Sequence, residues 1–228
     1  MAEISAKLVK ELRDRTGLGM MECKKALQEA DGDIETAIDN LRKSGQAKAA
    51  KKAGNIAADG AIIIAQEGNK ALLLEVNCQT DFVAKDAGFT AFAEKVAQLA
   101  LENNTTDVAK IAQLPYGDGQ TVEEARVALV QKIGENIQIR RAEVIEGDNL
   151  ATYRHGIRIG VVVSYENGND ATGKSVAMQV AAFNPIAVDE ATVPADILAR
   201  EKDIIEAKAR ESGKPDNVVE KMITGGLQ

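Results

Sequence analysis

The chain has 228 residues, of which 45% are hydrophobic and 28% charged, the usage of an ordinary globular protein. It carries 28 Lys and Arg against 35 Asp and Glu, a net charge of −7, and aromatic residues make up 3% of it. Nucleic-acid binding needs excess positive charge and, for single strands, aromatic stacking platforms, so no direct contact with nucleic acid is expected.

Residues 1–54 are predicted to form a three-helix domain followed by a basic linker. Turn signals at 16–17 and 31–32 separate three short stretches, and Asp33 is placed to cap the third helix. Residues 43–54, rich in Lys, Ala and Gly, are interpreted as a linker with helical tendency. The apolar residues that recur at helical spacing are Ile4, Leu8, Val9 and Leu12, then Cys23, Ala26, Leu27 and Ala30, then Ile34, Ala37, Ile38 and Leu41.

Residues 55–140 are predicted to form a first core lobe. Apolar runs at 61–65 and 71–76 flank a Gly- and Asn-containing turn, which is typical of a β-hairpin. A helix carrying an apolar face from Phe89 to Leu99 follows, and another covers about residues 121–133.

Residues 141–190 are predicted to form a second, similar lobe. Residues 137–144 alternate like a half-buried strand, 158–165 form a second strand, and 176–183 have a helical pattern. Two hairpin-plus-helix units in series predict an α+β core.

Residues 191–228 are predicted to form a helical hairpin arm. A helix over about 194–210 is broken at 212–215 before a last helix that ends near residue 224. With few partners inside the chain, such an arm favours docking to another molecule.

The cysteines and the start of the chain exclude several kinds of site. Cys23 and Cys78 are far apart, without a CxxC pair or a Cys/His cluster, which predicts neither a disulfide framework nor a zinc site. Residues 1–17 are charged and amphipathic, unlike a signal peptide, and no apolar run is long enough to span a membrane. We therefore expect a cytoplasmic protein with no cofactor and no membrane contact.

His155 is the one histidine of the sequence. A His-pair metal site is therefore excluded, and a Ser/His/Asp triad would lack the GxSxG nucleophile elbow. We interpret His155 as a loop or strand-end residue that makes a hydrogen bond, and we expect no catalytic residues.

Residues 168–175, GNDATGKS, match the phosphate-loop pattern GxxxxGK[ST]. The match would make the chain a nucleotide hydrolase that uses Lys174 and Ser175. A parallel sheet and an acidic magnesium partner should then follow, and the remaining sequence predicts neither. We favour a polar turn with a chance match and keep the hydrolase as the alternative.

Phe82 stands in the polar segment Thr80-Asp81-Phe82-Val83, directly after a predicted buried strand. If this segment projects, the ring can fill a pocket of a partner, since one aromatic ring buries about 150–250 Å². If it does not, Phe82 folds back onto the hairpin while Asp81 or Asp86 caps the next helix. The residues alone leave both interpretations open.

Met20 and Met21 begin the second predicted helix. Flexible thioethers at a helix start suit adaptable contacts, and Met20 is the better surface candidate, whereas Met21 is as well suited to core filling.

Several blocks together resemble bacterial elongation factor Ts. The likeness covers about residues 2–222, and its main blocks are RTGLGMMECKKAL at 15–27, GDIETA at 32–37, LRKSG at 41–45, EVNCQTDFVA at 75–84, KIGENI at 132–137, His155-Gly156 with RIGV at 158–161, and SGKP at 212–215.

The resemblance implies a guanine-nucleotide exchange factor, not an enzyme, whose partner is the translational GTPase elongation factor Tu. It implies a ubiquitin-associated-like domain at 1–54, a two-lobed core, and a coiled-coil arm, shorter here, through which two heterodimers pair. The element that intrudes into the GTPase and dislodges Mg²⁺ matches Thr80, Asp81, Phe82 and Val83. Further contact positions match Leu12, Met20, Met21 and His155.

Overall fold

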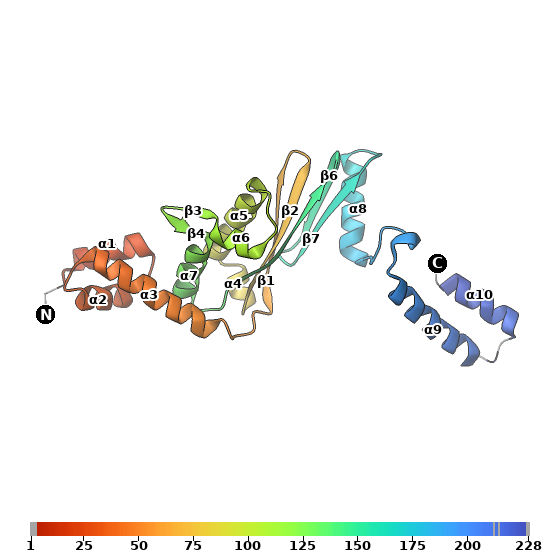
Figure 1. Cartoon of the computed structure of the whole chain (residues 1–228), viewed down its shortest axis with the longest axis horizontal. Helices are drawn as coiled ribbons and strands as arrows, with labels where there is room; N and C mark the ends of the chain where they lie inside the picture. Colours follow the sequence, from red (N-terminus) through yellow and green to blue (C-terminus); the bar gives the residue numbers. More distant parts are fainter. Residues whose placement is uncertain (1–3, 212, 214, 227–228) are drawn as a thin grey trace. The chain divides into compact units, whose positions relative to one another are not determined.

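The computed structural model describes residues 4–211, 213 and 215–226. Helices and antiparallel strands both contribute, which is compatible with the α+β class (Figure 1). The chain divides into two compact units, of which the first ends at residue 181 and the second begins at residue 182. In the described part of the chain, no helix has both the length and the apolar character to cross a membrane.

Three helices begin the first unit: α1 (Ala6–Thr16), α2 (Met20–Glu29) and α3 (Ile34–Lys52). Gly17 ends α1 in the left-handed conformation, φ 68°, which glycine adopts without steric cost. The predicted cap of α3 is confirmed, because the Asp33 carboxylate accepts a hydrogen bond from the backbone N–H of Thr36 at 2.7 Å. Leu12, Cys23, Leu27 and Ala37 are buried in the core between these helices.

The predicted linker at 43–54 is wrong as a separate segment, because α3 continues through it to Lys52. Its Ala and Lys residues are good helix formers, and one face is buried against α7 (Val122–Ile133). At Gly45 a Cβ atom would come within 2.4 Å of the Gln131 Oε1. Gly45 therefore lies in close contact with the Gln131 side chain of α7.

A three-stranded antiparallel sheet, β1 (Asp59–Glu67), β2 (Lys70–Cys78) and β5 (Gln138–Glu146), forms the centre of the unit in the order β1-β2-β5. The predicted hairpin is confirmed by the β1–β2 register. Helices α4 (Asp81–Ala84), α5 (Ala87–Glu102), α6 (Val108–Gln113) and α7 follow β2, and a short hairpin, β3 (Pro115–Gly117) with β4 (Gln120–Thr121), precedes α7. The apolar face of α5, with Phe89, Phe92 and Val96, is buried in this core, as predicted.

The hairpin of the predicted second lobe is formed by a different pair of strands from the pair that the sequence pattern predicted. Residues 137–144 were expected to open it, but β5 pairs with β2, so this strand crosses the predicted lobe boundary at 140/141. The hairpin consists of β6 (Asn149–His155), which was not predicted, and β7 (Ile159–Tyr165). Helix α8 (Asp170–Phe183) follows it.

The second unit carries a 3₁₀ turn (Glu190–Thr192) and two helices, α9 (Ala195–Glu211) and α10 (Asp216–Gly226), which contact each other. These bounds agree with the helices predicted at 194–210 and up to about 224. Ser212 and Lys214, at the predicted break, lie outside the described residues.

Candidate partner-binding site

Phe82 lies on α4, a single helical turn directly after β2, and its side chain is 82% exposed. The interpretation in which the ring folds back onto the hairpin is therefore wrong for this structure. The capping part of that interpretation is confirmed, because the Asp86 carboxylate accepts hydrogen bonds from Gly88 N and Phe89 N at the start of α5. Val83, next to Phe82, instead packs against the core.

Glu135, in the connection between α7 and β5, accepts hydrogen bonds from the two residues that precede α4. One carboxylate oxygen, Oε2, accepts hydrogen bonds from the backbone N–H groups of Gln79 (3.0 Å) and Thr80 (3.1 Å). The other, Oε1, accepts one from the Thr80 hydroxyl at 2.7 Å. The same hydroxyl accepts the N–H of Val83 at 3.4 Å and so caps α4.

A group of amide side chains ties the turn to two further segments. The Gln79 Oε1 accepts from the backbone N–H of Asn136 (2.8 Å) and from the Asn55 Nδ2 (3.1 Å). Asn136 is buried, and its Nδ2 donates to the carbonyl of Asn55 at 2.8 Å. We call these three side chains, Asn55, Gln79 and Asn136, the amide knot. It joins the end of β2 to the chain entering β1 and to the chain entering β5.

Asp81 lies beside Phe82 on the exposed side of α4. Its carboxylate accepts a hydrogen bond from the Lys85 Nζ at 2.8 Å, four residues on. The hydrogen bond and the charge of this ammonium lower the pKa of Asp81. Asp81 is therefore an exposed carboxylate whose partner is an exposed surface lysine.

Cys78 lies under the turn, and its thiol donates a hydrogen bond to the carbonyl of Thr80 at 3.2 Å. Burial, with the nearby charge of Glu135, raises the pKa of this thiol to about 11. The thiol is thus a structural group and not a nucleophile.

Met20 and Met21 begin α2, and their side chains are 60% and 76% exposed, so both are surface residues. Leu12 is fully buried in the helical core and makes no surface in this structure. Glu22, next to the methionines, forms an ion pair with Lys48 of α3 and accepts a hydrogen bond from the Gln131 Nε2 at 3.0 Å. We call this group, Glu22, Lys48 and Gln131, the head anchor, because it joins α2 and α3 to α7.

His155 ends β6, where its Nδ1 lies 3.1 Å from the Tyr153 hydroxyl. The turn that follows packs on the central sheet, because the Ile62 N–H donates to the carbonyl of Ile157 at 2.8 Å. The prediction of a strand-end residue with a hydrogen bond is confirmed. His155, the methionines and Phe82 stand on three separate elements, β6, α2 and α4, of the same unit.

The phosphate-loop alternative does not fit the geometry of residues 168–175. Helix α8 already begins at Asp170, so the N–H of Gly173 donates to the carbonyl of Asn169 and is not available to a phosphate. Gly173 is buried against Tyr165, where a Cβ atom would come within 2.5 Å of the ring. The strand before it, β7, pairs with β6 in a two-stranded antiparallel sheet, not in a parallel one.

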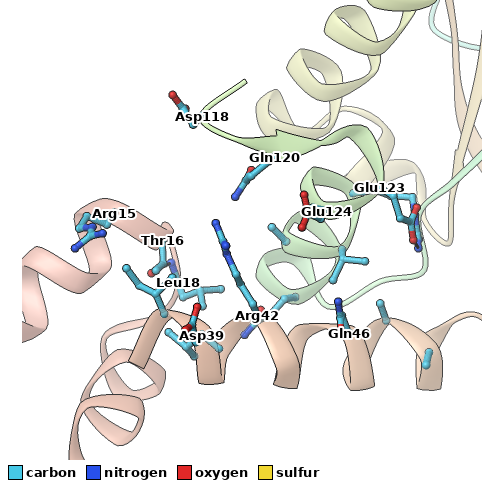
Figure 2. Close-up of a pocket in the computed structure, with 18 of the residues that line it drawn as sticks. Arg15, Thr16, Leu18, Asp39, Arg42, Gln46, Asp118, Gln120, Glu123 and Glu124 are labelled. Atoms are coloured by element: carbon cyan, nitrogen blue, oxygen red, sulfur yellow. Dashed lines mark hydrogen bonds and ion pairs between the residues drawn. The ribbon is translucent and has the colours of Figure 1, made fainter. Parts of the chain in front are cut away.

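A cleft of about 840 Å³ opens between α3 and α7, and no motif in the sequence indicates it. Figure 2 shows Arg42 pointing from α3 toward Gln120, with Glu124 beside it. Three arginines and five carboxylates line the cleft, a mixture that selects neither an anion nor a cation. Among the described residues, no group of three or more His, Cys, Asp or Glu is placed to hold a metal ion.

The sequence reasoning missed Glu135 and Asn136 as parts of this site. Their partners lie more than 50 positions earlier in the chain, as in the contact of Glu135 with Thr80, so no local periodicity shows them. The one signal for these two residues was their place in the KIGENI block at 132–137.

Comparison with known proteins decides the family. The family described as Elongation factor TS matches residues 79–228, which include α4 and His155. The chain is 80% identical to elongation factor Ts of Psychrobacter sp. (strain PRwf-1) over all 228 residues, covering 78% of that protein. It is 80% identical over 226 residues to that of Psychrobacter arcticus, covering 99% of this chain and 77% of the relative. It is 70% identical over 228 residues to that of Acinetobacter baumannii (strain AYE), covering 78% of it.

The chain belongs to the elongation factor Ts family. Elongation factor Ts proteins are nucleotide exchange factors in translation elongation rather than catalytic enzymes, and their partner is elongation factor Tu. The motif blocks at 15–27 and 75–84, on which the resemblance rested, therefore led to the right family.

Proposed function

We propose that this chain binds elongation factor Tu in its GDP-bound form, displaces Mg²⁺ and so promotes the release of GDP. The observation that carries the proposal is the exposed ring of Phe82 on a turn that is hydrogen-bonded to the rest of the unit. A large apolar side chain held in water by a fixed turn costs free energy in the free protein, and burial in a partner recovers it.

The exchange needs no acid, base or metal of this chain. Mg²⁺ in a GTPase bridges protein oxygens and nucleotide phosphates, so displacing its ligands removes a large part of the hold on GDP. In the proposed complex Phe82 is the wedge that enters the GTPase. Asp81, whose lysine partner is solvent-exposed, can exchange that ion pair for a polar contact with the partner.

Other contacts of the proposed complex come from separate elements. Met20 and Met21 offer an adaptable apolar surface on α2, and His155 offers a polar contact at the end of β6. The buried side chain of Leu12 supports α1 behind this surface. We assign recognition to the segment 1–54, which we expect to resemble a ubiquitin-associated domain.

The core segments at 55–140 and 141–190 are proposed to carry the wedge and the contact of His155. Pairing of two heterodimers through the arm at 191–228 stays a prediction. The proposed place of action is the cytoplasm, where translation elongation occurs.

The test is the rate at which elongation factor Tu releases a fluorescent GDP analogue when the full chain is added. We expect Phe82→Ala to slow the release at least about tenfold, a loss of about 1.4 kcal/mol. Phe183→Ala is the matched control, because its ring is also mostly exposed, at 77%, but lies at the end of α8. Equal rates for Phe82→Ala and the unchanged chain would refute the wedge.

A further inference from the structure

Helix α4 is too short to fix its own direction. It has four residues, and one helical turn does not gain enough hydrogen bonds to offset the ordering of its backbone. The direction of Phe82 must therefore come from contacts outside the turn. Val83 and Ala84 pack against the core on one side of the turn. Within the described residues, the contacts that hold its N-terminal end come largely from Glu135.

We propose that Glu135 is a positioning residue for nucleotide exchange, which fixes the orientation of α4 and so aims Phe82 at the partner. This inference rests on the proposed role of Phe82. Glu135 acts through Thr80 and is not itself offered as a contact to the GTPase.

A glutamate is suited to this position for two reasons. Its two oxygens accept three hydrogen bonds at once, two from backbone N–H groups and one from the Thr80 hydroxyl. Its own backbone is held between Gly134, which ends α7, and Asn136 of the amide knot.

The expected consequence of losing Glu135 is a smaller fraction of molecules in which the Phe82 ring is oriented to enter the partner. If the turn samples several orientations, only the fraction with the ring correctly aimed can enter the partner, and the observed exchange falls in proportion. Loss of Glu135 should therefore reduce the exchange rate without changing any group that touches elongation factor Tu.

The first experiment compares Glu135→Ala with Glu135→Gln in the fluorescent GDP release assay. We expect Glu135→Ala to slow the release about five- to tenfold, and Glu135→Gln, which keeps an acceptor for the two N–H groups, to remain within about twofold. Glu124→Ala is the matched control, since Glu124 also accepts a backbone N–H, that of Thr121 at 2.8 Å, at a helix start away from α4. It should leave the release rate within about twofold of the unchanged chain.

The second experiment separates positioning from general destabilisation. On a Phe82→Ala background, adding Glu135→Ala should slow release no further, because a residue that acts through Phe82 loses its effect when the ring is gone. Amide hydrogen exchange at Val83 and Ala84 should be faster in Glu135→Ala than in the unchanged chain, whatever the role of the ring.

These readouts distinguish the two failures. If Phe82→Ala slows release and Glu135→Ala does not, Glu135 is not a positioning residue. If Phe82→Ala has no effect, the wedge fails, and the amide exchange at Val83 still decides whether Glu135 orders the turn. If Glu135→Ala does not fold, Thr80→Val is used in its place, because this change removes the hydroxyl that joins Glu135 to Val83. Thr80→Ser, which retains the hydroxyl, is its control.

Discussion

Phe82 combines a large exposed apolar surface with a fixed base. The residue pattern indicated both a projecting ring and a ring folded back, because a Phe in a polar segment is compatible with either. The structure decides between them through the partly buried Val83 and the buried Ala84, which pack against the core and thereby turn Phe82 to the opposite side of α4. The choice depends on packing that two adjacent residues make with distant ones, which a single segment of sequence does not contain.

Cys78 gives a prediction at the same scale. With a pKa of about 11, about one thiol in a thousand is a thiolate at pH 8, and the side chain is fully buried. We expect iodoacetamide to leave Cys78 unmodified in the native chain at pH 8 and to modify it readily in concentrated guanidinium chloride. Mass spectrometry of the peptide that contains Cys78 measures this. Modification at equal rates in both states would contradict the geometry of the thiol.

At the scale of elements, the three helices α1, α2 and α3, which we call the head, are attached to the rest of the first unit through the contact of α3 with α7. The attachment combines the close approach at Gly45 with the head anchor of Glu22, Lys48 and Gln131. Burial alone would raise the pKa of Glu22, but its hydrogen bonds with Lys48 and Gln131 outweigh that effect and lower it. The contact between the three-helix domain and the core therefore includes an ionised carboxylate.

This lowered pKa predicts the direction of a pH effect. A carboxylate with a lower pKa in the folded state stabilises the fold above its unfolded pKa and loses that contribution as the pH falls through the folded value. We expect Glu22→Gln to lower stability by about 0.5–1 kcal/mol at pH 7, and the difference from the unchanged chain to shrink below about pH 4. Thermal unfolding at several pH values measures it.

The control for this prediction lies on the same helix. Glu29 pairs with Lys25 at 3.7 Å, and both side chains are mostly exposed. Glu29→Gln should therefore have an effect within the error of the measurement at every pH. A constant difference for Glu22→Gln from pH 7 to pH 3 would show that its charge is not what joins the head to the core.

The elements themselves were predictable to different degrees. The helices of the head, the β1–β2 hairpin and α7 follow from local spacing and caps, such as Asp33 at the start of α3. Strand β6 escaped prediction because its sequence, NLATYRH, has no apolar run, and β5 was given the wrong neighbour. Strand pairing is a property of two segments, so the pattern within one strand does not determine it.

At the scale of the whole molecule, exchange is a coupling between two binding equilibria. If the chain weakens the hold of elongation factor Tu on GDP by some factor, GDP must weaken the hold on the chain by the same factor. We expect the ratio of the two GDP affinities, with and without the chain, to equal the ratio of the two chain affinities, with and without GDP. Isothermal titration calorimetry measures all four. An affinity for the chain that excess GDP leaves unchanged would contradict the proposed mechanism.

The head anchor and the amide knot, both within the first unit, should respond differently to ionic strength. The head anchor contains an ion pair whose side chains are 29% and 50% exposed, so dissolved salt screens it. The amide knot contains no charged group, and Glu135 accepts its hydrogen bonds from neutral N–H and O–H groups, so dissolved salt affects neither strongly. Raising the salt concentration should thus loosen the methionine surface while the Phe82 turn keeps its place, which gives the two contact surfaces separate sensitivities to the same solvent.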